Sequence, residues 1–453
     1  MDNTVISNYS AQRNINAQEC ACYAPQRSLY IGLRGNVWSC CFNKTHVLGK
    51  YPEQSLEEIW HGAQRKNLSE ALGSFDFSKG CHGCEALIEA GDYHNLPAKN
   101  FDHLSTNPHG FPTKVDFELS NECNLECIMC RGEFSSAIRK NREKLPAIPT
   151  AYDRAFLEQL RPFIPHIEHS HFLGGEPFLI PIYLDIWEMM VEHNPDVRIS
   201  VQTNATILSE RVKAILERMQ FDMAISIDSF TKKTYEHIRQ TASFDKVMAN
   251  INWFRDYCDR KSTRLTISFC PMTVNWSEIP SVIRQCNDWG VKLFLNTVYH
   301  PKELSFSSLT REKLDEIILE LSQQTFSTEN EIENWNQSSF MGLLGQLKSW
   351  RENAKSMHSP SANGNTYADY VRNLSDYLRL NLDTPMAGRE LAVAECIDKL
   401  DYILIEAELQ GVRENAEAKM MEVTFNEMLQ SLPTTSKTHL LYLFKSFMLP
   451  LTD

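Results

Sequence analysis

The chain has 453 residues, more than one hydrophobic core normally serves, so we expect two or three domains. Its formal net charge of -13 argues against a nucleic-acid backbone as the main partner. Hydrophobic residues make up 42%, yet no apolar run is long enough for a membrane span and the polar start lacks a signal-peptide pattern, so we expect a cytoplasmic protein with no membrane partner.

The cysteines are concentrated in the first third of the chain. Of thirteen in total, nine lie between residues 20 and 130. Since disulfides seldom persist in the cytoplasm, this clustering indicates metal binding or redox use. The nine are Cys20, Cys22, Cys40, Cys41, Cys81, Cys84, Cys123, Cys127 and Cys130.

The first part of the chain has the elements of a small α+β domain. Residues 28–33 and 37–41 favour strands, and Gly35 between them is typical of a hairpin turn. Ser55, with Glu58 three residues later, forms a capping-box pattern that predicts the start of a helix. These elements and the surrounding cysteines predict a separate cysteine-rich domain, which we place at residues 1–98.

Two cysteine pairs with this separation are compatible with a zinc ribbon. The order of parts also resembles the SPASM/twitch domain of radical S-adenosylmethionine (SAM) enzymes. These parts are a cysteine, a hairpin, a second cysteine, a Ser-Leu-x-Glu-Ile-Trp helix start and a C-x2-C pair. In the family this domain usually follows the catalytic barrel, whereas here it comes first. The resemblance implies an auxiliary 4Fe-4S cluster held by Cys22, Cys40, Cys81 and Cys84, with Cys20 and Cys41 as alternatives to their neighbours.

Beyond a proline-containing linker, residues 108–300 alternate predicted strands with helical patterns. Such alternation indicates a parallel sheet, and six strand-helix units make three quarters of an eight-stranded barrel. We therefore expect an α/β fold, a partial (β/α)6 TIM-like barrel, with active residues at the C-terminal ends of the strands. The predicted strands are residues 114–119, 167–173, 198–203, 222–228, 264–270 and 292–298.

After the first of these strands, Cys123, Cys127 and Cys130 form a C-x3-C-x2-C loop. A 4Fe-4S cluster normally takes four thiolates, so a loop of three leaves one iron open to a small molecule. On spacing alone, two alternatives remain. The thiols could belong to a zinc knuckle completed by a distant histidine, or they could be reduced cysteines in a core.

The loop and its position after the first strand resemble the radical SAM enzymes. The resemblance implies that SAM chelates the open iron through its amino and carboxylate groups. A one-electron reductant such as flavodoxin or ferredoxin reduces the cluster, and SAM is cleaved to methionine and a 5'-deoxyadenosyl radical that abstracts hydrogen from the substrate. The cofactor carries this chemistry, and the protein positions it.

Gly174, Gly175, Glu176 and Pro177 follow the second predicted strand. Alone, this sequence predicts an ordinary turn whose glycines allow a close backbone approach. In this position, the family resemblance implies that Glu176 accepts a hydrogen bond from the amino group of SAM. It also implies SAM contacts for Met129, Thr203, Asn204, Ser226, Asp228 and Arg239.

Residues 301–453 change to long helical patterns, which predict a C-terminal helical subdomain. Within it, an apolar stripe at helical spacing runs from Val393 through Cys396 to Ala407. If a helix of this subdomain caps the barrel, Cys396 is a candidate hydrogen donor to a substrate radical, and Cys270 at the end of the fifth strand is its rival. A buried core position is the alternative for Cys396.

The family resemblance also bears on the substrate. SPASM/twitch relatives often modify ribosomally made peptides, so we expect a radical SAM enzyme that epimerises or cross-links a peptide. Dehydrogenation of a small molecule is the alternative within the same enzyme class. A zinc-binding scaffold without catalysis is the alternative from another class.

Overall fold

The computed structural model describes residues 1–13, 20–356, 367–381 and 393–400, with a few further positions between residues 403 and 432. The chain divides into two compact units, residues 1–354 and 355–453, and each is described by itself. Residues 301–354 lie in the first unit together with the strands of the barrel. The domain boundaries drawn from the sequence stay a prediction.

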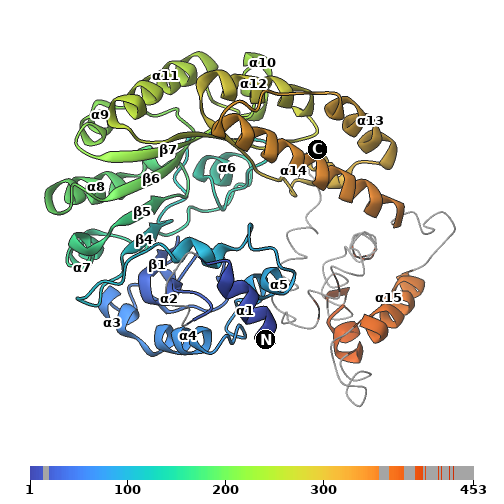
Figure 1. Ribbon diagram of the computed structural model, residues 1–453, viewed down its shortest axis with the longest axis horizontal. Coiled ribbons are helices and arrows are strands. Elements are labelled where there is room, and N and C mark those ends of the chain that lie inside the picture. Colours follow the sequence, from blue (N-terminus) through green and yellow to red (C-terminus); the bar gives the residue numbers. More distant parts are fainter. Residues whose placement is uncertain are drawn as a thin grey trace. The chain divides into compact units, whose positions relative to one another are not determined.

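Six parallel strands form the centre of the first unit (Figure 1). Each of them pairs in parallel with the next along the chain, as the alternation of strands and helices predicted. The α/β class is therefore confirmed. The strands are β4 (Lys114–Phe117), β5 (His169–Phe172), β6 (Arg198–Thr203), β7 (Gln220–Ser226), β8 (Leu265–Phe269) and β9 (Lys292–Leu295).

Helices cover the outer side of this curved sheet (Figure 1). Since side chains alternate between the two faces of a strand, the outer face is apolar and the inner face polar. Phe172 of β5 packs against Trp187 on the outside, whereas His171 and Ser200 line an inner cavity of about 840 Å³. The outer helices are α7 (Arg154–Leu160), α8 (Pro181–His193), α9 (Glu210–Leu216), α10 (Lys232–Ile238), α11 (Phe244–Lys261) and α12 (Ile279–Trp289). The short helix α6 (Ser136–Asn141) lies inside the arc of this layer in Figure 1.

The N-terminal domain joins the barrel by extending its sheet. β1 (Ser28–Ile31) pairs in parallel with β4, and Ser28 lies opposite Lys114. β2 (Asn36–Trp38) and β3 (Gly49–Lys50) continue the sheet with antiparallel pairing, which gives nine strands in the order β3-β2-β1-β4 to β9. The two cysteine-rich regions therefore share one sheet, a pairing that the sequence did not predict.

Two local features of this domain agree with their sequence patterns. Gly35 has a φ of 85°, and a Cβ at this position would lie 1.9 Å from the carbonyl oxygen of Tyr51, so the hairpin turn requires glycine. The hydroxyl of Ser55 accepts from the amide of Glu58, whose carboxylate accepts in return from the amide of Ser55, which confirms the capping box. The helices here are α1 (Asn3–Ala11), α2 (Ala24–Arg27), α3 (Leu56–His61), α4 (Ala63–Gly73) and α5 (His82–Glu89).

After β9, the helices α13 (Arg311–Ser322) and α14 (Glu331–Ser356) complete the first unit. In the second unit, α15 (Tyr367–Asn381) and the helical residues 393–400 share a small apolar core that contains Leu374 and Cys396. The predicted stripe is confirmed from Val393 to residue 404, and Ala407 lies outside the described residues. Within the described part of the chain, no helix has the length and apolarity that crossing a bilayer requires.

Candidate active site

The three-cysteine loop follows the C-terminal end of β4 and is held from two sides. On one side, the amide of Cys123 donates to the hydroxyl of Ser136 on α6 at 3.1 Å. On the other side, the amide of Ile128 donates to the carbonyl of Ile238 at the end of α10 at 2.9 Å. The neighbouring helices therefore fix the backbone that carries the thiols.

All three thiols line one cavity of about 490 Å³. Burial raises the pKa of Cys123 to about 11 and that of Cys127 to about 12, although the charge of Arg239 opposes the shift at Cys127. Burial raises the pKa of Cys130 as well. Thiolates are the metal-binding form, and the raised pKa keeps the free thiols protonated, so a bound metal would have to displace their protons. In the described chain no fourth cysteine lines this cavity, a donor set that fits a cluster with one open iron.

The glycine pair packs backbone to backbone against the start of the cysteine loop. Gly174 has a φ of 81°, and a Cβ on Gly175 would lie 2.0 Å from the carbonyl oxygen of Glu122. That same oxygen accepts from the amide of Glu176 at 2.7 Å. Only glycine fits this approach, which leaves the backbone of Gly174 and Gly175 in the cavity wall.

Glu176 is fully buried and is bonded to the end of β6. One carboxylate oxygen accepts from the hydroxyl of Thr203 at 2.6 Å, and the other accepts from the amide of Asn204 at 2.7 Å. Burial raises the pKa of Glu176 to about 7, and these hydrogen bonds oppose the shift. Thr203 and Asn204 line the cavity, whereas Glu176 is absent from its wall. Glu176 therefore positions these two residues, and its direct contact with SAM stays a prediction.

The end of β6 is also bonded to the cysteine loop. The side-chain amide of Asn204 lies 3.3 Å from the side-chain oxygen of Asn124 and 3.9 Å from the sulfur of Cys123. The side-chain amide of Asn124 donates in turn to the hydroxyl of Thr206 at 3.0 Å. A weak hydrogen-bond donor near a thiolate stabilises its negative charge. Asn204 also lines the cavity, so this residue faces both the cysteine loop and the cavity.

A buried ion pair supports the opposite wall. Arg239 lies 2.8 Å from Asp228, and the two side chains are 7% and 0% exposed. The other oxygen of Asp228 accepts from the amide of Cys270 at 2.7 Å. Arg239 lines the cavity, and its Nε is buried without a hydrogen-bond partner. The guanidinium of Arg239 therefore brings a positive charge to the cavity wall, which suits a carboxylate bound there.

Met129 and Ser226 also line the cavity, as the sequence predicted. Cys270 does not line it but packs in a small apolar cluster with Ile128 and Met129, and burial raises the pKa of its thiol. Cys396 is 1% exposed in the core of the second unit, the position that its apolar stripe also predicts. The hydrogen-donor roles of Cys270 and Cys396 stay predictions.

Besides Arg131 and the apolar residues Leu125, Phe134 and Leu173, the sequence did not predict three polar residues of the cavity wall, namely Glu118, Gln202 and His300. They lie at or just beyond the C-terminal ends of β4, β6 and β9, where the barrel rule places active residues. That rule, applied to every polar residue near a strand end, would have found them.

Glu118 links the cavity to the N-terminal domain. Its carboxylate accepts from the hydroxyl of Tyr30 on β1 at 2.5 Å and pairs with the ammonium group of Lys44 at 3.0 Å. Both partners belong to the N-terminal domain, which reaches the cavity wall because β1 lies beside β4. The N-terminal domain therefore orients a polar residue of the candidate site.

The N-terminal domain contains a second cavity of about 330 Å³, ringed by Cys22, Cys40, Cys81 and Cys84. Burial raises the pKa of Cys84 to about 12, and raises the pKa of Cys22 well above the usual thiol value. The remaining wall is largely apolar. Cys20 and Cys41, the two alternatives, are not in the cavity wall, and Cys41 is exposed.

These four thiols surround a hollow and do not converge on a point. Across the described residues, no group of three or more His, Cys, Asp or Glu side chains is arranged to hold a single metal ion. A zinc ion needs all its ligands within bonding distance of one centre, whereas each thiolate of a 4Fe-4S cluster binds a separate iron. Four thiols around one hollow fit a 4Fe-4S cluster, and the ligand assignment stays a prediction.

Comparison with known protein families finds two matching regions. Residues 117–286 match the radical SAM superfamily, and residues 20–85 match an iron-sulfur cluster-binding domain, SPASM. Both regions contain the cysteines on which the sequence resemblance was based. The two resemblances are therefore confirmed.

The curated relatives have different names. The probable GTP 3',8-cyclase of Methanocella arvoryzae is 28% identical over 166 residues, which cover 36% of this chain and 47% of the relative. The cysteine-type anaerobic sulfatase-maturating enzyme of Clostridium novyi is 32% identical over 156 residues, which cover 30% of this chain and 39% of the relative. The chain thus spans about half the length, or less, of these relatives.

Two solved structures are similar over part of the chain. Native anSMEcpe with bound AdoMet has a TM-score of 0.36 at 18% identity, and the match covers 46% of this chain and 59% of the anSMEcpe chain. Streptococcus suis SuiB bound to S-adenosylmethionine has a TM-score of 0.34 at 14% identity and covers 59% of each chain.

Proposed function

Because residues 117–286 form a radical SAM domain and residues 20–85 a SPASM-type iron-sulfur domain, we propose that this chain is a radical SAM enzyme with an auxiliary 4Fe-4S cluster. The observation that carries the proposal is the cavity in which three thiols, the glycine pair and the ends of β6 and β7 meet. A bound cluster with SAM would supply a 5'-deoxyadenosyl radical that abstracts hydrogen from the substrate.

In this proposal, the residues of the chain bind and orient. Cys123, Cys127 and Cys130 would each hold one iron, and the positive charge of Arg239 favours the thiolate of Cys127. The guanidinium of Arg239 in the cavity wall is suited to the carboxylate of SAM. The backbone of Gly174 and Gly175 lies in the cavity wall, where it would face the amino end of SAM.

Apolar residues of the same cavity would keep water from the reacting centre. Leu125, Met129, Phe134 and Leu173 lie in its wall beside the polar groups. A radical reacts with whatever hydrogen lies nearest, so a dry and shaped wall favours the intended substrate. Gln202 lines both this cavity and the inner barrel cavity, so the two cavities adjoin at this residue.

A ribosomally made peptide is the proposed substrate class. The SPASM-type domain and the sulfatase-maturating relative, whose name describes action on a protein, support a polypeptide. A small molecule is the second candidate, supported by the GTP 3',8-cyclase names among the relatives. Epimerisation and cross-linking are the proposed peptide reactions.

The test uses the anaerobically reconstituted full chain with SAM, dithionite and the peptide encoded nearest to its gene. We expect 5'-deoxyadenosine together with a changed peptide, measured by mass spectrometry in D2O. One solvent deuterium at an otherwise unchanged residue would identify epimerisation, and loss of two hydrogen atoms would identify a cross-link. No reductant-dependent 5'-deoxyadenosine would contradict the radical SAM activity itself.

If the product is epimerised, the hydrogen donor is tested with Cys396→Ala and Cys270→Ala. The variant that lacks the donor should still cleave SAM but no longer invert the residue. Inversion that survives both substitutions would remove both cysteines from the mechanism.

A further inference from the structure

The last strand of the barrel sheet has a free outer edge. β9 pairs with β8 on one side, and in the described chain no strand pairs with its other side. The amide of Asn296, just beyond the strand, donates inward to the carbonyl of Phe269 at 2.8 Å. The N–H and C=O groups of successive residues point to opposite sides of an extended strand. Because those of Asn296 point inward, those of Leu293 and Leu295 point outward.

Side chains of α14 already satisfy the first of these outward positions. The amide of Leu293 donates to the side-chain oxygen of Asn336 at 2.7 Å. The carbonyl of Leu293 accepts from Trp335 at 3.1 Å and from Ser339 at 3.3 Å. At Leu293, α14 thus takes the place of a neighbouring strand.

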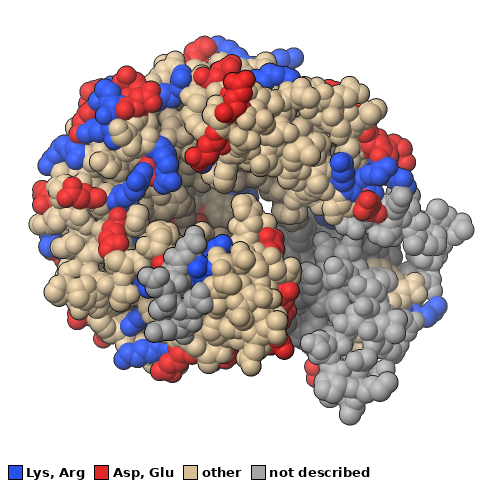
Figure 2. Space-filling model, viewed as in Figure 1, with Lys and Arg blue, Asp and Glu red and all other residues tan. Residues whose placement is uncertain are grey.

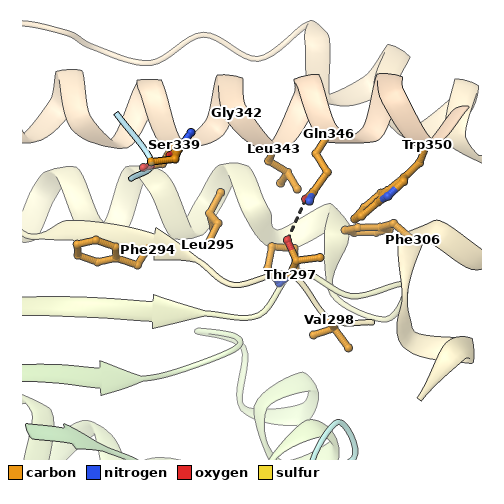
Figure 3. A pocket seen from close by; sticks show the side chains of 12 residues that line it. Phe294, Leu295, Thr297, Val298, Phe306, Ser339, Gly342, Leu343, Gln346 and Trp350 are labelled. Atoms are coloured by element: carbon orange, nitrogen blue, oxygen red, sulfur yellow. Dashed lines mark hydrogen bonds between the residues drawn. The ribbon is translucent and has the colours of Figure 1, made fainter. Parts of the chain in front are cut away.

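At the next outward position the helix leaves a groove. Leu295, Thr297 and Val298 line one wall of a cavity of about 430 Å³, and residues of α14 line the other (Figure 3). The hydroxyl of Thr297 donates to Gln346 at 2.9 Å across it. In the described chain no side chain bonds the backbone of Leu295, in contrast to Leu293.

The α14 wall of this groove is uncharged and partly apolar. Residues 334–347 contain no charged side chain, and the surface over the middle of α14 is largely uncharged in Figure 2. Met341 on the helix is 51% exposed, and Phe294 on β9 is 42% exposed. Gly342 lies in the wall, where an added Cβ would have no atom within 4 Å. The wall therefore has room for side chains of another molecule.

The groove lies next to the candidate active site. Pro271 in its wall directly follows Cys270, and Val298 in its wall packs in the same apolar cluster as Met129 of the SAM cavity. β9 runs toward the C-terminal end of the barrel, where that cavity lies. At about 3.3 Å per residue, a strand paired with Leu295 would reach the active end of the barrel within a few residues.

We propose that this groove binds an extended segment of the peptide substrate, which adds to the sheet as a strand beside β9 at Leu295. This inference rests on the proposed peptide-modifying function and names its recognition surface. Alternating backbone donors and acceptors next to apolar pockets suit a polypeptide, because main-chain hydrogen bonds give affinity and side-chain pockets give selectivity. The residue to be modified would then lie a short distance along the peptide, in the barrel.

Two glycines of α14 provide a matched test. Gly342→Leu fills the groove, whereas Gly345→Leu adds the same side chain one turn later at a position outside its wall, and both sites have free space for a Cβ. The probe is a fluorescein-labelled peptide selected on the full chain from a display library of short random peptides. We expect Gly342→Leu to weaken its binding roughly tenfold or more, and Gly345→Leu to leave it within about twofold.

Backbone recognition is tested by N-methylation of alternate residues of the same peptide. One alternating set should abolish binding and the other should be tolerated, because only every second amide of an added strand points toward β9. Equal binding to wild type and Gly342→Leu, equal effects of both methylated sets, or enrichment of no peptide would each overturn the proposal. SAM cleavage without peptide is measured in parallel, and its absence in wild type would contradict the proposed function and leave the binding result standing.

Discussion

The two cysteine-lined cavities of the first unit differ in the residues around their thiols. The barrel cavity has three thiols beside polar groups such as Asn204, Ser226 and Arg239. The N-terminal cavity has four thiols in a largely apolar wall. Polar groups are costly to bury without partners, so their presence in one cavity indicates a polar ligand there. Four thiols and an apolar wall suit a cluster with every iron bound by the protein.

The largest expected effect separates the two sites by activity. Replacing Cys123, Cys127 and Cys130 together by alanine should lower bound iron from about eight to about four per chain and abolish 5'-deoxyadenosine formation. Replacing Cys22, Cys40, Cys81 and Cys84 should lower iron equally but retain cleavage of SAM. Iron analysis and chromatography measure both outcomes.

The buried cysteines Cys258 and Cys286 of the barrel provide the control, because they line neither thiol-ringed cavity. Their alanine variants should keep all iron. SAM cleavage by the first triple variant would show that the catalytic cluster had been assigned to the wrong loop.

A second experiment compares neighbouring cysteines in the N-terminal domain. Cys40 lies in the cavity wall and Cys41 is exposed outside it. Cys40→Ser should therefore reduce the iron of the auxiliary site, whereas Cys41→Ser should leave the iron content and the visible absorption unchanged. If Cys41→Ser lost iron instead, the ligand set would have to be redrawn.

A third experiment tests how much the buried ion pair beside the barrel cavity contributes to stability. Asp228→Asn leaves Arg239 buried without its charged partner, which should lower the free energy of unfolding by about 3–5 kcal/mol. Denaturant unfolding of the full chain measures this loss. An exposed pair such as Arg260 with Glu217 is the control, and Glu217→Gln should cost less than about 1 kcal/mol. Equal losses would mean that the buried pair has no special role.

The smallest expected effect depends on pH. Burial raises the pKa of Glu176 to about 7, above the ordinary value of 4.5. Between these values the unfolded chain has released the proton while the folded chain retains it, so Glu176 destabilises the fold progressively as pH rises from about 4.5 to 7. The stability advantage of wild type over Glu176→Gln should therefore shrink by about 1–3 kcal/mol across this range. An advantage that grew with pH would show that Glu176 is ionised throughout.

Much of this architecture was predictable because it depends on local patterns. The strand alternation, the Gly35 turn and the Ser55 capping box each follow from a few neighbouring residues. The cysteine spacings indicated both family regions for the same reason. The grouping of Cys22, Cys40, Cys81 and Cys84 around one cavity also follows the predicted set.

The unpredicted features depend on contacts between distant segments. The strand of residues 28–31 carries no local signal that β4 will be its partner, because any parallel edge offers the same backbone groups. The burial of Glu176 depends on the position of Thr203 and Asn204. Likewise, the contact of Glu118 with Tyr30 exists only because β1 lies beside β4.

The pairing of β1 with β4 has a consequence for how the protein can be divided. A fragment that began at residue 108 would keep the barrel strands but lose the strand that covers β4, leaving that edge unpaired. Exposed edges of parallel sheets recruit other chains and promote aggregation. The N-terminal domain thus covers the edge of the barrel's first strand. We therefore expect the barrel to stay soluble only together with the N-terminal domain, although each has its own set of thiols.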